Sequence, residues 1–218
     1  MMVLAIFGAS GQGKEVREIA DYQNKKDNRW EKIIFIDDNK PEGQFMGLDM
    51  MKLDTAIQKF KEVEFVIAVG EPKTKKKIFE RLSSLNCKFG SVISPDSQIS
   101  PYCRLGRGLV IKRGAIISAD AVVGDDTTIQ SYACIGHDAI IGKHCQISTH
   151  VDVGGQSVLG DCVFVGLNSP IRELITIGDN AIISAGAVVL KNVEANVTVM
   201  GNPARVISRN TENNKVFH

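Results

Sequence analysis

The stretch Ile135–Val153 reads IGHDAIIGKHCQISTHVDV, and every sixth residue in it is aliphatic. The same spacing runs without insertion from Ile93 to Val189, which gives seventeen aliphatic positions. Neither the 3.6-residue period of a helix nor the two-residue period of a strand produces a strict six. A parallel β-solenoid does, because each coil repeats the same inward contact. The run therefore predicts a left-handed parallel β-helix, a hexapeptide-repeat solenoid of about five triangular coils.

The residues between the aliphatic positions agree with this interpretation. Gly or Ser often follows the aliphatic residue, where glycine tolerates a tight corner. Small residues, including Cys103 and Cys145, stand three positions further on and suit a narrow interior. The five cysteines are odd in number and form no CxxC pair, so we expect reduced thiols that fill space.

The first part of the chain has a different pattern. A strand over Val3–Phe7, a glycine turn and a helix from Lys14 to Tyr22 are followed by further strands and by a helix that begins at Pro72. Alternating strands and helices predict a small parallel, Rossmann-like α/β sheet. We expect an α/β domain over residues 1–88, the solenoid over 89–207 and a C-terminal tail over 208–218.

The glycine turn, Gly8-Ala-Ser-Gly-Gln-Gly13, has the pattern GxxGxG and lacks the NAD fingerprint GxGxxG. Backbone N–H groups at such a turn and at a helix N-terminus can still bind a phosphate, so a mononucleotide or nucleotide-sugar fits better. A purely structural turn is the alternative. Asp37 and Asp38 favour binding, because they follow the second strand at the edge where ribose contacts form.

The bulk composition excludes several classes of protein. With 218 residues, 44% hydrophobic content, 23% charged residues and a net charge of +1, the chain has no basic field for nucleic acid. No apolar run is long enough for membrane insertion, and Met1–Ser10 lacks the basic start of a signal peptide, so a cytoplasmic location is expected.

Three of the four histidines lie in the solenoid. His137 follows a corner glycine and points outward, and Asp138 can orient it as a general base. His144 and His150 are expected to be surface residues on neighbouring faces. A zinc site of the gamma carbonic anhydrase type is the alternative, but the histidines do not converge within a subunit, and no metal is expected.

The whole combination resembles the sialic acid O-acetyltransferase (NeuD/PglD-like) family of hexapeptide sugar acetyltransferases. The residues that carry the resemblance are the glycine loop, Phe35-Ile-Asp-Asp38, Ala68-Val-Gly70, the hexapeptide run, Gly136-His-Asp138 and Gly201-Asn-Pro-Ala-Arg205. The resemblance implies a homotrimer with sites between subunits and acetyl-CoA as cosubstrate. The acceptor it implies is a nucleotide-linked sugar for bacterial surface glycans.

The resemblance also implies a role for individual residues. His137 is the general base with Asp138 orienting it, Gly155 presents its N–H to the thioester oxygen, and Gln146, Lys191 and Arg205 are expected near acetyl-CoA. The nucleotide-sugar is expected at Ser10, Gly11, Gly13, Asp37, Asp38, Gly70 and Lys75, with Gln130 in the acceptor pocket. The helix that contains Lys75 is expected to turn its lysines to solvent.

Several positions depart from the family pattern. Gln146 replaces a frequent histidine, Gln130 an asparagine, Gly136 a glutamate and Lys75 an arginine. These changes concern the acceptor more than acetyl transfer. The sequence therefore predicts N-acetylation of a nucleotide-linked amino sugar. O-acetylation of a sialic acid-type sugar and a non-catalytic solenoid that binds nucleotide-sugar are the alternatives.

Overall fold

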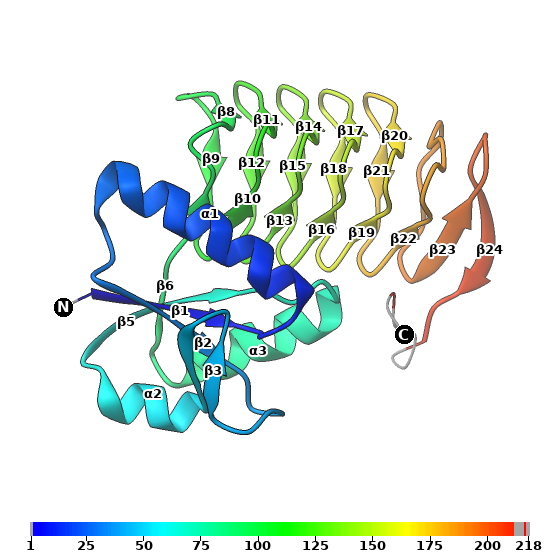
Figure 1. Cartoon of the computed structure of the whole chain (residues 1–218). Coiled ribbons are helices and arrows are strands. Elements are labelled where there is room, and N and C mark those ends of the chain that lie inside the picture. Colours follow the sequence, from blue (N-terminus) through cyan, green and yellow to red (C-terminus); the bar gives the residue numbers. More distant parts are fainter. Residues whose placement is uncertain (1, 212–215, 217–218) are drawn as a thin grey trace.

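The computed structural model describes residues 2–211 and Val216, and it contains an α/β unit packed against a solenoid (Figure 1). The α/β unit comprises β1 (Met2–Phe7), α1 (Gly11–Asp27), β2 (Lys32–Ile36), β3 (Gly43–Phe45), β4 (Leu48–Met51), α2 (Leu53–Lys59), β5 (Glu62–Ile67), α3 (Pro72–Ser84) and β6 (Lys88–Phe89). Its sheet has the order β3-β4-β2-β1-β5-β6, and all pairs except β3–β4 are parallel. This confirms the small parallel α/β sheet.

Burial explains why these strands form. The central strand β1 is fully apolar and covered on both faces, as is typical of parallel sheets. Val16 and Ala20 of α1 cover one face, and Phe79 and Leu82 of α3 cover the other together with α2. Pro72 begins α3 as expected, and the short hairpin β3–β4 is an element that the sequence did not predict.

The second unit is a three-sided parallel β-helix, as the six-residue period predicts. Its strands are β7 (Val92–Ile93), β8 (Gln98–Ile99), β9 (Arg104–Leu105), β10 (Val110–Ile111), β11 (Ile116–Ile117), β12 (Val122–Val123), β13 (Thr128–Ile129), β14 (Cys134–Ile135), β15 (Ile140–Ile141), β16 (Gln146–Ile147), β17 (Asp152–Val153), β18 (Val158–Leu159), β19 (Phe164–Val165), β20 (Pro170–Ile171), β21 (Thr176–Ile177) and β22 (Ile182–Ile183). Strands β23 (Val197–Met200) and β24 (Arg205–Arg209) close its end as an antiparallel pair.

Every third strand stacks in register, so residues 18 apart lie above one another. Face 1 contains β7, β10, β13, β16, β19 and β22 and continues into β23 and β24, face 2 contains β8, β11, β14, β17 and β20, and face 3 contains β9, β12, β15, β18 and β21. The aliphatic residue of each strand points inward, and those from Ile111 to Val189 are at most 3% exposed. The predicted core row is therefore confirmed.

The corner glycines act differently from the expectation. A Cβ on Gly136 would lie 2.6 Å from the backbone nitrogen of Gly155 in the next coil, so these glycines permit close stacking of coils. The left-handed backbone falls two residues later, for example at Asp138 (φ 57°) and Asn180 (φ 57°). Asp and Asn tolerate this region better than other side-chain-bearing residues.

The α/β unit covers face 1 of the early coils (Figure 1). Val92 and Val110, which point outward from face 1, are buried in the same apolar cluster as α1 and the sheet. Tyr22 and Gln23 of α1 add hydrogen bonds to Asp96 and to the N–H of Ile93. Strand β24 extends two residues into the segment expected to be a tail, and residues 212–215 and 217–218 of that segment lie outside the described part. Every helix of the described residues is too short or too polar to span a bilayer.

Candidate active site

His137 and Asp138 lie at the corner between faces 2 and 3, directly after β14. The His137 Nδ1 is 2.7 Å from the Asp138 Oδ2, and the two side chains are 66% and 51% exposed. A carboxylate oxygen accepts this hydrogen bond when Nδ1 carries the proton, and in that neutral tautomer Nε2 has the lone pair of a base. This is the arrangement of an oriented general base at the protein surface.

Gly155 occupies the same corner one coil further along. A Cβ built on Gly155 would lie 2.7 Å from Nε2 of His137, so the imidazole fits here because residue 155 has no side chain. Within the described residues, the Gly155 N–H has no hydrogen-bond partner, whereas the next N–H, of Gln156, is bonded to the His137 carbonyl at 2.9 Å. A base and an unpaired N–H donor therefore lie side by side.

The mutation Gly155→Ala tests this contact. The new methyl group must displace the exposed His137 ring, so we expect acetyl transfer to fall about 100-fold, in line with small misplacements of catalytic groups. Unfolding temperature should change little, because Gly155 does not have a left-handed φ and an exposed ring can move. Gly43→Ala, at a position with open space around it, is the control. A Gly155→Ala enzyme with normal turnover would contradict the contact.

Lys191 lies at the same corner in the last coil, because Val189 pairs with Ile171 before it and Val193 pairs with Ile177 after it, although this coil is two residues shorter there. Three coils at about 4.8 Å each separate Lys191 from His137 by roughly 14 Å. Lys191 and Arg205 are both exposed and line one groove of about 290 Å³. The structure thus brings together the two cations that were expected near acetyl-CoA.

The glycine loop lies at the carboxyl edge of the sheet, between β1 and α1. Ser10 precedes α1 and makes no capping hydrogen bond, and the first turn of α1 contains no acidic residue. The helix N-terminus therefore offers unpaired N–H groups to an anion. A Cβ on Gly13 would collide with the Gly8 carbonyl, so glycine is needed there for packing.

The two aspartates after β2 are used differently. Asp37 accepts from the N–H of Ala9 at 3.3 Å and lies beside Lys40, so it shapes the glycine loop. Asp38 accepts from the N–H of Leu53 at the start of α2, and its other oxygen is 2.5 Å from Arg81. Gly70 lies in the loop between β5 and α3, at the same edge.

Gln146 does not lie near His137 in the same chain. It points outward from face 1 and is 1% exposed, and neither its amide nitrogen nor its amide oxygen has a partner in the described part of the chain. Gln130 lies at the corner between faces 1 and 2, where its Oε1 accepts from the Thr149 hydroxyl at 3.1 Å. Gln12, in the first turn of α1, was missed from the sequence, although it lies inside the glycine motif; its Nε2 is buried and also unpaired among the described residues.

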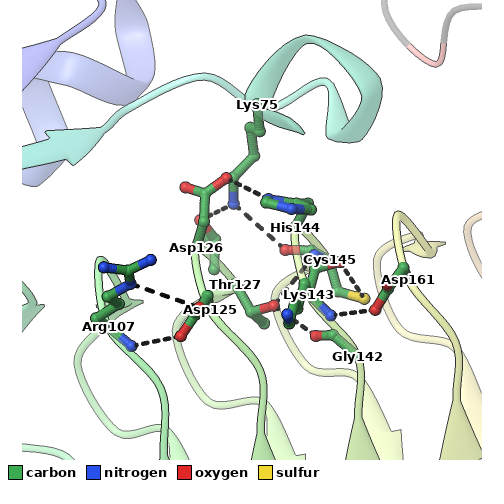
Figure 2. A network of polar contacts seen from close by, with 11 residues as sticks. Lys75, Arg107, Asp125, Asp126, Thr127, Gly142, Lys143, His144, Cys145 and Asp161 are labelled. Carbon is green, nitrogen blue, oxygen red and sulfur yellow. Dashed lines mark hydrogen bonds and ion pairs between the residues drawn. The ribbon is translucent and has the colours of Figure 1, made fainter. Parts of the chain in front are cut away.

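The position of Lys75 differs from the prediction that its side chain points to solvent and contacts the nucleotide. It is 0% exposed, and its Nζ donates to the Thr128 hydroxyl at 3.0 Å and to the Cys145 carbonyl at 3.4 Å (Figure 2). Lys75 therefore joins α3 to face 1 of the solenoid. Burial lowers the pKa of Lys75, and the nearby charge of Asp126 opposes that shift.

The prediction that His144 lies at the surface is also wrong, because its side chain is buried. Its Nδ1 is 2.9 Å from the Asp126 Oδ2 (Figure 2). Its ring packs edge-on against Phe79 of α3, with the ring centroids 5.1 Å apart. His150, by contrast, is exposed and stacks on Tyr132, so the surface expectation is confirmed for it. His137, His144 and His150 occupy three different corners.

Comparison with known proteins gives a consistent family. Residues 3–82 match the model of the PglD N-terminal domain, and residues 86–175 match that of the GMPPB C-terminal domain. The acetyltransferase domain of PglB from Neisseria gonorrhoeae, solved with acetyl coenzyme A, is similar over 94% of this chain and 98% of its own, with 27% identity and a TM-score of 0.86.

Two other relatives define the limits of the similarity. Perosamine N-acetyltransferase from Caulobacter crescentus shares the fold, with a TM-score of 0.87 at 23% identity over 95% of this chain and 98% of its own. Serine acetyltransferase from Synechococcus elongatus is 34% identical over 114 residues, which are 51% of this chain and 43% of that protein. The chain thus spans less than half the length of that curated relative. These matches identify a PglD N-terminal domain in residues 3–82 and show that the chain as a whole has the architecture of the PglB acetyltransferase domain, in which a hexapeptide-repeat solenoid follows such a domain.

Proposed function

We propose that the protein transfers the acetyl group of acetyl-CoA to the amine of a nucleotide-linked amino sugar used for bacterial surface glycans. The observation that carries this proposal is the His137–Asp138 pair with the unpaired N–H of Gly155 beside it. The acetyl coenzyme A of the PglB domain and the GDP-perosamine named for the Caulobacter enzyme are consistent with it.

The chemistry needs one base and one hydrogen-bond donor. The nitrogen of the sugar amine attacks the thioester carbonyl while His137 takes a proton from that amine. The Gly155 N–H stabilises the negative charge on the carbonyl oxygen. The C–S bond then breaks, and the proton passes from His137 to the CoA thiolate. A thioester is already activated, so positioning and one base are sufficient for transfer.

The acetyl donor is proposed to lie along the corner column. Lys191 and Arg205 provide positive charge about three coils from His137, where the phosphates of CoA can bind. Glu173 occupies the intervening coil of the same column. The thioester then reaches Gly155 and His137 at the other end.

The acceptor is proposed to come from another subunit. The α/β unit covers face 1, and His137 lies at the corner between faces 2 and 3, which is the edge of the prism opposite to face 1. A sugar held by the glycine loop of one chain therefore does not reach His137 of that chain across the prism. A homotrimer with its sites between neighbouring subunits would bring the two halves together.

A panel of nucleotide-sugars with and without a free amine tests the reaction, scored by release of the CoA thiol. We expect turnover only with amine-bearing members. Turnover of hydroxyl-only sugars would assign O-acetylation instead. Thermal stabilisation by nucleotides but not by acetyl-CoA would contradict both transferase functions and favour a binding module.

A further inference from the structure

A hollow of about 550 Å³ lies between α3 and the corner that joins faces 3 and 1, and none of the proposed catalytic groups lines it. We call it the α3 groove. Its lining includes Lys73, Lys76 and Lys77 from α3, and Cys162, Asn180 and Asn196 from successive coils. Its volume is within the range of small-molecule sites in proteins.

The groove is the open continuation of the contact between α3 and the solenoid. The corner between faces 3 and 1 presents one residue with left-handed backbone per coil: Gly108, Asp126, His144, Cys162, Asn180 and Asn196. At Asp126 and His144 α3 fills the space: Lys75 lies beside Asp126 (Figure 2) and Phe79 packs against His144. From Cys162 onward, the corner residues Cys162, Asn180 and Asn196 face α3 across the hollow.

The charges of the groove are not balanced within the described chain. The side chains of Lys76 and Lys77 are exposed and make no hydrogen bond or ion pair among the described residues. The buried Lys75, by contrast, faces the carboxylate of Asp126. The ladder residues opposite the groove are neutral, and Glu80 is the carboxylate of its lining.

Two aspartates near the groove make no hydrogen bond or ion pair with these lysines among the described residues. The Asp161 Oδ1 accepts from the N–H of Lys143 at 2.7 Å, and the Asp179 Oδ1 accepts from the N–H of Asp161 at 2.8 Å. Both carboxylates are therefore held by the backbone of the coil before them. The positive charge of α3 remains available to a ligand from solution.

The polar groups of the coils complement an anion that carries several oxygens. Within the described residues, the side-chain amides of Asn180 and Asn196 have no hydrogen-bond partner, so each can donate to a ligand. Asn210, at the open end, is already bonded to Thr198 and to the Asn180 carbonyl, which fixes the floor of the groove. Burial raises the pKa of the Cys162 thiol to about 11, so this thiol adds no negative charge at neutral pH.

We propose that the α3 groove binds a small phosphate-bearing anion through Lys76, Lys77 and the amides of Asn180 and Asn196. Ammonium and amide donors facing across a hollow recognise phosphate oxygens by charge-assisted hydrogen bonds. Two sources share this chemistry, and each would replace a placement proposed above: the diphosphate of a nucleotide-linked sugar, in place of the glycine loop, and the phosphates of CoA, in place of Lys191 and Arg205. The choice between these sources rests on the proposed function, whereas the anion site itself does not.

The test is calorimetric titration with inorganic pyrophosphate, a nucleoside diphosphate and 3′,5′-ADP, with no acetyl donor and no amino sugar present. The charge reversal Lys76→Glu with Lys77→Glu is expected to weaken binding about tenfold or more. The matched control is Lys25→Glu with Lys26→Glu, which makes the same change in the last turn of α1 and should leave affinity unchanged. Asn180→Asp keeps shape and tolerates the left-handed backbone, and should weaken binding several-fold.

The outcomes are distinct. If the Lys76→Glu with Lys77→Glu variant loses affinity for the nucleoside diphosphate alone, the groove is assigned to the nucleotide. If it loses affinity for 3′,5′-ADP alone, the groove is assigned to CoA. The proposal would be overturned if the α1 control variant lost as much affinity as the α3 variant, or if no probe bound the wild type at millimolar concentration. Because turnover is measured separately with the acceptor panel, failure of the groove and failure of the proposed reaction can be told apart.

Discussion

Replacing His137 with alanine is expected to lower kcat for acetyl transfer by about 10²- to 10⁴-fold at pH 7, the range of a general base. The reason is geometric: Nδ1 is fixed by Asp138 at 2.7 Å, which leaves Nε2 as the basic atom beside Gly155. Because the side chain is 66% exposed, its removal leaves no cavity. Circular dichroism and the unfolding temperature should therefore match those of the wild type.

Two further variants sharpen this experiment. Asp138→Asn keeps the shape but removes the carboxylate that orients the ring, and a smaller loss of kcat is expected. Lys143→Ala alters an exposed side chain on another corner of the same coil and should leave kcat unchanged. If His137→Ala turns over at the wild-type rate, His137 is not the base, and the proposed chemistry fails at its central step.

The solenoid could be predicted because a single local rule repeats. An aliphatic residue at every sixth position implies an inward contact in each coil, and the structure buries Ile111, Ile135 and Val165 in one continuous core. The 18-residue coil also follows from that rule, and Gly155 is 18 residues from His137, although its role beside His137 was expected from the family resemblance alone. The α/β sheet was accessible for a similar reason, since its strands are continuous apolar runs.

The contact between the two units could not be predicted in the same way. The six-residue period treats all three faces alike and does not say which one the α/β unit covers. His144 and Gln146 are therefore buried because of where another unit packs, which no local pattern reveals. Lys75 did carry a signal, because it lies four residues before Phe79 and so shares its helix face. This signal was overlooked because every lysine of that helix was expected to be exposed to solvent.

Replacing Lys75 with glutamate is expected to cause the largest loss of stability of these variants. The new carboxylate would be buried beside Asp126, itself 1% exposed, and would lose the bonds to Thr128 and Cys145. Breaking a buried charge arrangement costs about 3–5 kcal/mol. At about 2–4 °C per kcal/mol for a chain of this size, the melting temperature should fall by roughly 6–20 °C.

Two matched changes separate charge from packing at this position. Lys76→Glu makes the same charge change one residue along α3, at an exposed site, and should shift the melting temperature little. Lys75→Met keeps the length of the side chain but leaves the buried Asp126 carboxylate without the ammonium group beside it, so we expect a loss of stability smaller than that of Lys75→Glu. A destabilisation by Lys75→Met as large as that by Lys75→Glu would show that loss of the ammonium group, and not repulsion between two buried carboxylates, causes the effect.

The pH dependence of the wild type relative to Lys75→Met provides the remaining evidence. Burial lowers the pKa of Lys75 in the folded protein below the 10.5 of the unfolded chain. Between these two values the unfolded state binds more protons, so the stability of the wild type increases with pH in this window. Methionine does not titrate, so the melting temperature of the wild type should rise relative to Lys75→Met as the pH approaches 10.5. Parallel curves would mean that Lys75 keeps its ordinary affinity for the proton, and that water or Asp126 compensates its burial in full.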